Sequence, residues 1–361
     1  MNKILTTGAA LLLTTTAATA GGLDRSGQGI GALFEDGGYA ELSYGQISPS
    51  VSGVFTVPAG PFAGAGLNSG NVAKSYSQLG FAVKQDISDQ LSFALIFDQP
   101  FGANVNYDET DPGHPLSGAS ADLSTRSLTA LARYKLNDNM SVYGGARMVE
   151  TQAEIRNIGG VYSADVEKDS DVGYVVGAAY ERKDIAMRVA LTYSSETEFS
   201  NNTSVGPGGP EGPTSYKLPQ SVNLDFQTGV AANTLVFGSI RWTEWTATSI
   251  TPFGYPAGPL VSYDNDTIAY NIGVGRRFND KLSGSVSIGF EKATGDLASE
   301  LAPTDGSVSI ALGAAYDLGN GMEVSGGVRY VKVGDATTET TFSSFEDNSA
   351  VGVGIKIGYS F

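Results

Sequence analysis

The chain has 361 residues, no cysteine, one histidine and a formal net charge of −16, with only 17% of its residues charged. Without cysteine there are no disulfides, cysteine-ligated metals or thiol nucleophiles, and one histidine gives little basis for a Ser–His–Asp triad or a histidine-rich metal site. The acidic balance disfavours nucleic acid, whose binding needs a basic surface. We therefore expect no enzyme, no cofactor, no metal site and no nucleic-acid partner. His114, flanked by Gly113 and Pro115, is expected to be a solvated loop residue.

The first residues have the pattern of an export signal. A short basic start is followed by an apolar stretch at 4–13 and by an A-x-A cleavage pattern at 18–20, which predicts a signal peptide over residues 1–20. Glycine alternates with apolar residues over 21–38; we expect this segment to fold into the lumen of the following domain as a short hatch, the alternative being a disordered leader. The remaining domain is 39–361. Export together with the absence of cysteine suits a periplasmic or outer-membrane location.

The body of the chain alternates with a period of two. In residues 349–361, apolar side chains occupy every second position, and glycine, serine and lysine occupy the positions between them. Successive side chains of a strand point to opposite faces, so this pattern predicts a strand with one apolar face. Helical spacing is nowhere sustained, so we expect an all-β protein. The same alternation recurs in 91–97, 172–180, 185–193, 268–274, 282–290 and 308–318.

Short turns and long polar segments also alternate along the chain. Asn, Asp and Gly mark short turns near residues 88, 138, 184, 233, 279 and 320, and such turns between alternating segments indicate hairpins. Seven repeats of strand, loop, strand and turn predict about fourteen antiparallel strands, with all long loops at one end, as in outer-membrane barrels. A β-propeller is the competing interpretation, but no blade signature recurs. The expected loops are 54–71, 108–121, 157–169, 201–216, 250–262, 296–305 and 335–344.

If the apolar face meets lipid, the opposite face lines the lumen and carries the charges. Charged side chains are tolerated inside a barrel and costly on its lipid face. Most of the lysines and arginines on the lumen face are expected to form a solvated ladder with nearby acidic residues. The more specific hypothesis is that a few of them hold the carboxylate of a passing ligand by charge-assisted hydrogen bonds. The candidates for this role are Arg147, Arg188, Arg329 and Lys356.

Two regions resemble the long-chain fatty-acid transporter (FadL/TodX) family of outer-membrane proteins. The stronger match is the Leu-Pro-x-Ser-Val strand in 217–226, followed by the Trp-Thr-x-Trp strand in 235–245; the other is Pro-Phe-Gly at 100–102. The resemblance implies a fourteen-stranded barrel with an N-terminal hatch, an interior pocket for hydrophobic ligands, and sideways release beside a bent strand. The chain departs from the family in one place: its hatch is short and lacks the Asn-Pro-Ala motif that is typical of relatives. The residues that it places at the bend or in the hatch are Phe101, Gly102, Leu23, Ile30, Leu33 and Phe34.

Pro100 and Gly102 leave two interpretations open. Proline removes a ladder donor and glycine adds backbone freedom, which favours a break in strand pairing at this point. The same residues are equally suited to begin the second external loop.

The resulting functional hypothesis is passive uptake of hydrophobic compounds across the outer membrane, with long-chain fatty acids as the expected ligands and aromatic hydrocarbons as the alternative. The expected partners are this ligand, outer-membrane lipid and lipopolysaccharide, and the barrel is expected to be a monomer. A general diffusion porin for small polar solutes is the first alternative. A structural or adhesive barrel is the second, with alternating acids at 165–171 that suit Ca²⁺ or a lipopolysaccharide bridge, although a solvated loop end is their commoner meaning.

Overall fold

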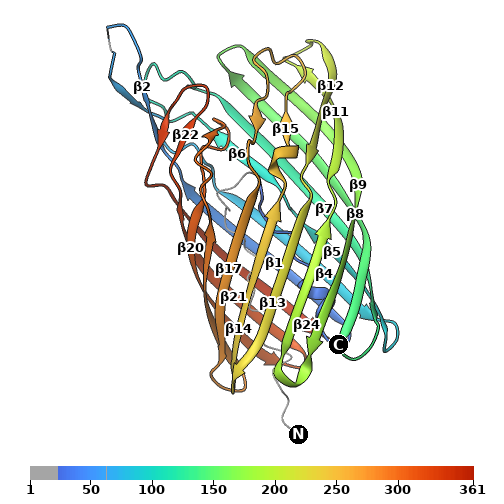
Figure 1. Ribbon diagram of the computed structural model, residues 1–361. Coiled ribbons are helices and arrows are strands. Elements are labelled where there is room, and N and C mark those ends of the chain that lie inside the picture. Colours follow the sequence, from blue (N-terminus) through green and yellow to red (C-terminus); the bar gives the residue numbers. More distant parts are fainter. Residues whose placement is uncertain (1–22, 62) are drawn as a thin grey trace.

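Segments whose apolar residues alternate with small or polar ones form long antiparallel strands, and these close into one barrel (Figure 1). The computed structural model describes residues 23–61 and 63–361. The expected signal peptide therefore lies outside the described residues. β1 closes the barrel because it pairs with β24 on one side and with β4 on the other. The predicted all-β fold, a fourteen-stranded antiparallel barrel, is confirmed.

Seventeen strands make the fourteen positions of the wall, because three positions each consist of two strands end to end: β5 with β6, β10 with β11, and β12 with β13. In chain order the wall strands are β1 (Tyr39–Ser50), β4 (Tyr76–Asp86), β5 (Leu91–Asp98), β6 (Gly102–Asn106), β7 (Ser120–Lys135), β8 (Met140–Ile158), β9 (Tyr162–Arg182), β10 (Met187–Ser194), β11 (Thr197–Val205), β12 (Glu211–Leu218), β13 (Ser221–Ala231), β14 (Thr234–Thr243), β17 (Thr267–Arg277), β18 (Leu282–Glu291), β20 (Ser307–Gly319), β21 (Met322–Val333) and β24 (Ser349–Ser360).

The two ends of the barrel differ. Short turns and the C-terminus lie at one end, and the long loops lie at the other, where they form two small sheets of their own (Figure 1). The loop strands are β2 (Gly53–Thr56), β3 (Gly66–Asn68), β15 (Ser249–Ile250), β16 (Val261–Ser262), β19 (Leu297–Ala298), β22 (Ala336–Thr338) and β23 (Ser344–Phe345). The 3₁₀ helices are η1 (Gly31–Phe34), η2 (Lys183–Ile185) and η3 (Trp245–Ala247). No helix within the described residues is long and apolar enough to cross a membrane.

The outer surface of the barrel is apolar and its inner surface polar. On β24, the exposed side chains are those of Val351, Val353, Ile355 and Ile357, whereas Lys356 points to the interior and pairs with an acid there. Exposed aromatic side chains lie near both ends of this apolar band, as in outer-membrane barrels. Those near the short turns include Phe93, Tyr134, Tyr316 and Tyr359, and those toward the loops include Tyr44, Tyr270, Phe290 and Tyr330.

Two predicted loops are wrong. Most of 157–169 belongs to β8 and β9, and most of 201–216 belongs to β11 and β12, which extend the wall beyond the apolar band. Here polar side chains stabilise the sheet by bonding across strands: the hydroxyls of Thr203 and Thr214 lie 2.6 Å apart. Outside the membrane both faces of a strand can be polar, so the loss of alternation at 200–204 does not signal a loop. In 162–167 the alternation persists, with Tyr162, Ala164 and Val166 buried in the loop-side core.

The expectation that His114 is solvated is also wrong. The imidazole is 4% exposed and lies against the rings of Phe55 and Tyr107, at 5.9 Å between centroids in each case. Its Nδ1 accepts a hydrogen bond from the backbone N–H of Leu116, and burial lowers its pKa. His114 is thus a packing residue of the loop core.

The orientation of β18 gives a test of the barrel register. Val286 is the central residue of the exposed face of this strand. We expect Val286→Arg to lower the free energy of unfolding in lipid vesicles by about 2–4 kcal/mol, because a charge then faces the centre of the bilayer. Val286→Leu is the matched control and should change it little. Equal stability of the two variants in urea titrations would contradict this register.

Candidate functional site

The N-terminal segment lies inside the barrel and ends in an aromatic side chain between two cations. η1 carries Phe34, whose ring centroid is 4.7 Å from the Cζ atom of Arg133 and 4.6 Å from that of Arg188. Tyr143 meets the same ring edge-on at 5.6 Å. Arg133 is in turn ion-paired with Glu181. Desolvated cation–π contacts of this kind are worth about 2 kcal/mol each, so Phe34 holds the hatch across the lumen near the short turns.

Glu35, next to this ring, is held away from water and close to both signs of charge. Burial raises the pKa of Glu35 to about 7, with Glu41 and Glu323 acting in the same direction and Lys356 and Arg188 opposing them. The carboxyl group of Glu35 therefore changes its charge near neutral pH.

The other end of the hatch is fixed to β14 by a buried ion pair. The Asp24 carboxylate accepts from Nε of Arg241 on β14 at 2.5 Å, and both side chains are buried. The same guanidinium donates to Ser221, Asn223 and the backbone oxygen of Gly27. A buried pair is stable only when its remaining polar atoms are also satisfied, and here the hatch and β13 supply most of those partners.

The barrel wall is interrupted beside this hatch segment. β4 and β5 pair from Asp86 opposite Ser92 up to Phe81 opposite Phe97, and the ladder then stops. Hydrogen bonding from backbone to backbone between these positions of the wall resumes only where the backbone N–H of Lys74 donates to the oxygen of Asn104. Before that point, the hydrogen bonds across the gap within the described residues involve the side chains of Gln78 and Gln99. Between the two points the strand bends at residues 99–101, where Pro100 has no N–H to donate. Of the two interpretations of Pro100 and Gly102, the described residues fit a break in pairing.

The hatch supplies the hydrogen bonds that the interrupted strand lacks. Gly102 donates to the backbone oxygen of Leu23 at 2.9 Å, and the backbone N–H of Arg25 donates to the oxygen of Pro100 at 2.8 Å. The Arg25 guanidinium lies over the ring of Tyr76 on β4, with its Cζ 4.0 Å from the centroid. A Cβ at position 102 would come within 2.6 Å of that Cζ, so a larger residue there would displace the Arg25 guanidinium from this position.

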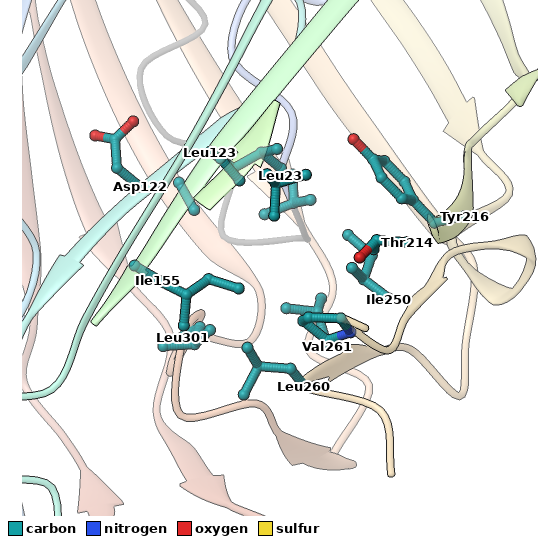
Figure 2. A pocket seen from close by; sticks show the side chains of 15 residues that line it. Leu23, Asp122, Leu123, Ile155, Thr214, Tyr216, Ile250, Leu260, Val261 and Leu301 are labelled. Carbon is teal, nitrogen blue, oxygen red and sulfur yellow. The ribbon is translucent and has the colours of Figure 1, made fainter. Parts of the chain in front are cut away.

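A cavity of about 50 Å³ lies directly above the hatch, on the loop side of the barrel (Figure 2). No lysine or arginine is among the described residues that line it. Asp122 contributes to the lining, but its carboxylate points away from the cavity in Figure 2 and accepts from Asn104. An engineered apolar cavity of about 150 Å³ holds benzene, so this one has about a third of that volume and would have to expand about threefold to hold a ligand of that size. Its other lining residues are Leu23, Ala103, Ala121, Leu123, Ala153, Ile155, Val166, Thr214, Tyr216, Ile250, Pro252, Leu260, Val261 and Leu301.

The structure brings some of the sequence-predicted site residues together. Leu23 lines the floor of the cavity, and Phe101 is packed with it in one apolar cluster, at the bend that Gly102 follows. Ile30 and Leu33 are buried lower in the lumen, where Phe34 lies between the arginines.

The four predicted carboxylate-binding cations do not form one site. Arg147 is buried and donates to Thr129 and Ser194, and Arg188 lies over Phe34. Lys356 pairs with Glu41 at 3.1 Å. Arg329, on β21, has a buried Nε without a hydrogen-bond partner among the described residues. They belong to four different strands and none lines the cavity.

The sequence interpretation missed the residues that fix the hatch. Asp24 and Arg25 are the only charges in a run of small and apolar residues over 21–34, which was a usable signal. Arg241 lies in a segment whose alternation was ambiguous, so its orientation toward the lumen needed the structure. The alternating acids at 165–171 lie on β9, and no group of three or more metal-ligating side chains occurs within the described residues.

Comparison with known proteins gives one family and several similar structures. The family model for outer membrane protein transport protein (OMPP1/FadL/TodX) matches residues 40–359. A Pseudomonas aeruginosa FadL homologue superposes with a TM-score of 0.74 at 15% identity, covering 91% of this chain and 92% of its own. The Pseudomonas putida toluene transporter TodX superposes with a TM-score of 0.65 at 13% identity, and the match covers 98% of each chain. The Ralstonia pickettii toluene transporter TbuX superposes with a TM-score of 0.60 at 14% identity, and the match covers 91% of each chain. No curated protein sequence matches this chain.

The ion pair of Asp24 and Arg241 can be tested through the hatch itself. We expect Asp24→Ala to weaken hatch docking by about 3–5 kcal/mol, because Arg241 is left buried without its counter-charge. Trypsin cleavage after Arg25 should then accelerate strongly. Asp36→Ala is the matched control, since it removes a hatch carboxylate whose pair with Lys183 is exposed and worth about 0–1 kcal/mol. Unchanged cleavage in Asp24→Ala would show that the pair does not hold the hatch.

Glu35 predicts a pH dependence of stability. Its pKa in the folded protein, about 7, is above the value in an unfolded chain, so the folded state binds the proton more tightly. The melting temperature should therefore be highest at about pH 4–5, fall as the pH rises toward 7, and then level off as far as this group is concerned. Glu35→Gln should remove this component. Parallel curves for the two proteins from pH 5 to 8 would contradict it.

Proposed function

The chain belongs to the OMPP1/FadL/TodX family of outer-membrane transport proteins, and on that premise we propose that it is a passive channel for small neutral hydrophobic compounds. It takes them from the loop side into the apolar cavity and releases them sideways through the break between β4 and β6. The observation that carries this proposal is the position of the cavity. Its floor is Leu23 and its wall includes Ala103, so it adjoins the segment where the ladder is interrupted.

The charge distribution supports neutral ligands. A carboxylate moved out of water needs a counter-charge, whereas an apolar ligand gains about 25 cal/mol for each Å² that it buries. The cavity lining has no cation among the described residues. Of the four lumen cations considered above, Arg147, Arg188 and Lys356 contact other groups, and Arg329 is not a lining residue. Long-chain fatty acids, the ligands expected from the sequence, stay a prediction that the same uptake assay tests.

The lower lumen supports sideways release over straight passage. Phe34, held by Arg133 and Arg188, lies across the path toward the short turns, and the apolar cluster around Leu33 fills the space beside it. A hydrophobic molecule that leaves through the wall reaches lipid without crossing these charged groups. A general diffusion porin would need this lower region to be open.

Uptake by cells that lack their own hydrocarbon and fatty-acid transporters tests the function. With this protein present, we expect uptake of labelled ethylbenzene to rise above the empty-vector level, while a small labelled sugar does not enter. Labelled oleate in parallel decides between a neutral and an acidic ligand. Sugar entry without ethylbenzene or oleate uptake would refute the proposal and favour an open porin.

The sideways route can be tested by closing the break. Gln78 Nε2 donates to the backbone oxygen of Gln99 at 3.5 Å across it, and the chain has no native cysteine. We expect the Gln78→Cys/Gln99→Cys pair, once oxidised, to lose ethylbenzene uptake and to regain it on reduction. The control pair is Ser287→Cys/Ala311→Cys, which joins two directly paired wall residues elsewhere. Uptake that persists in the oxidised test pair would refute sideways release.

A further inference from the structure

Three buried polar atoms beside the cavity have no hydrogen-bond partner among the described residues. They are Nε1 of Trp245, Oγ1 of Thr248 and the hydroxyl oxygen of Tyr263. The side chains of Trp245 and Thr248 are themselves almost completely buried. Buried polar groups in native proteins are nearly always hydrogen-bonded, and leaving one unpaired is costly. Three such atoms around one short hairpin therefore need an explanation.

The hairpin geometry places these atoms on the cavity side. In the β15–β16 pair, Ile250 is opposite Val261, and both line the cavity. If the same antiparallel register continues by two residues from the Ile250–Val261 pair, Thr248 is opposite Tyr263. Side chains two residues apart in a strand lie on the same face. Thr248 and Tyr263 therefore point to the same side as the two lining residues.

Ring contacts connect this polar group to the bend in the wall. Trp245 lies 5.1 Å from Tyr263 and 5.9 Å from Phe101 between ring centroids. Trp245 and Phe101 belong to one apolar cluster with Leu23, Leu123 and Tyr216, three residues that line the cavity, and Tyr263 packs against that cluster. The rings of Trp245 and Tyr263 thus pack against residues that line the cavity and lie close to the proposed exit, although neither ring nor Thr248 is itself part of the lining.

The chemistry of the three groups indicates what they bind. An indole N–H only donates, and a hydroxyl can donate or accept, so together they suit an oxygen acceptor. All three are neutral. Arg241, on β14 and four residues before Trp245 of η3, has its charge compensated by Asp24. A neutral oxygen therefore fits this group better than a carboxylate.

We propose that Trp245, Thr248 and Tyr263 form an oxygen-binding subsite at the base of the cavity. The channel then prefers neutral hydrophobic compounds that carry a carbonyl, ether or hydroxyl oxygen over hydrocarbons of the same size. The apolar body of the ligand occupies the cavity, and its oxygen pairs with the three donors. This inference rests on the proposed function, because it specifies the ligand of the same cavity.

Binding of a matched pair of ligands tests the subsite. Labelled acetophenone and ethylbenzene differ little in size, but only the first has an acceptor oxygen. Equilibrium dialysis of the full-length protein in detergent, corrected for partition into protein-free micelles, gives both dissociation constants. We expect acetophenone to bind at least tenfold more tightly, since each hydrogen bond contributes about threefold to tenfold.

Two variants remove oxygens of the subsite and a third is the control. Tyr263→Phe and Thr248→Val should each reduce the preference for acetophenone by about threefold to tenfold and leave ethylbenzene binding unchanged or stronger. Ser249→Ala, on the opposite face of the hairpin, should keep the wild-type preference. The heat-dependent mobility shift of the folded barrel on detergent gels verifies that each variant folds.

The outcomes separate the subsite from the function on which it rests. Equal partition-corrected affinity for the two ligands, or a preference that both variants retain, would overturn the subsite while leaving a hydrocarbon channel intact. Failure of the wild-type protein to bind either ligand would overturn the subsite and the proposed role of the cavity together.

Discussion

A barrel wall that faces lipid has to pair every backbone donor and acceptor within the protein, since no water reaches it there. This constraint explains why the chain forms a closed sheet in which β1 pairs with β24 as well as β4. It also makes the bend at Pro100 costly, because the ladder between β4 and β5 stops there. The backbone of Leu23 and Arg25 provides the missing partners from the lumen side. The hatch is therefore part of the wall at this position, and its docking and the break depend on each other.

The hatch joins two kinds of interaction that are usually separated in a protein. Its upper end is fixed by the buried pair of Asp24 with Arg241, and its lower end by the ring of Phe34 among cations. Leu23 lies directly beside the upper fixing point and forms the floor of the apolar cavity. The ion pair of Asp24 and Arg241 thus holds the apolar side chain of Leu23 in position, and no charged group of the described residues points into the cavity (Figure 2). The proposed preference for neutral ligands follows from this separation, because no lysine or arginine is among the described residues that line the cavity.

Sequence-based prediction was accurate where one periodic signal repeats many times. The alternation in β18, β20 and β24, together with the short turns, predicted the number of strands. The same signals predicted which side chains face outward and which end of the barrel carries the loops. Prediction was less accurate beyond the apolar band. There β11 continues as a strand that is largely polar on both faces, although its hydrogen bonding does not stop. In β9, Tyr162, Ala164 and Val166 still alternate with polar residues, but they are buried in the loop-side core instead of facing lipid. His114 was misjudged for a related reason, since Gly113 and Pro115 indicate a turn but not whether other loops cover it.

The sequence by itself determined a fourteen-stranded barrel with an apolar outer face, because lipid imposes the same period-two requirement on every wall strand and each strand records it locally. The residue pattern of 21–38 predicted the hatch, and the family resemblance agreed with it and added the bend. Only the tertiary structure decided which charges meet, because Asp24 and Arg241 are more than two hundred residues apart in the chain and no local pattern relates them. It also decided that Arg147, Arg188 and Lys356 contact separate partners, that Arg329 lies on a fourth strand, and that Thr248 and Tyr263 share one face beside the cavity. These contacts arise from closure of the barrel around its own N-terminus, which brings together residues that have no relation in sequence.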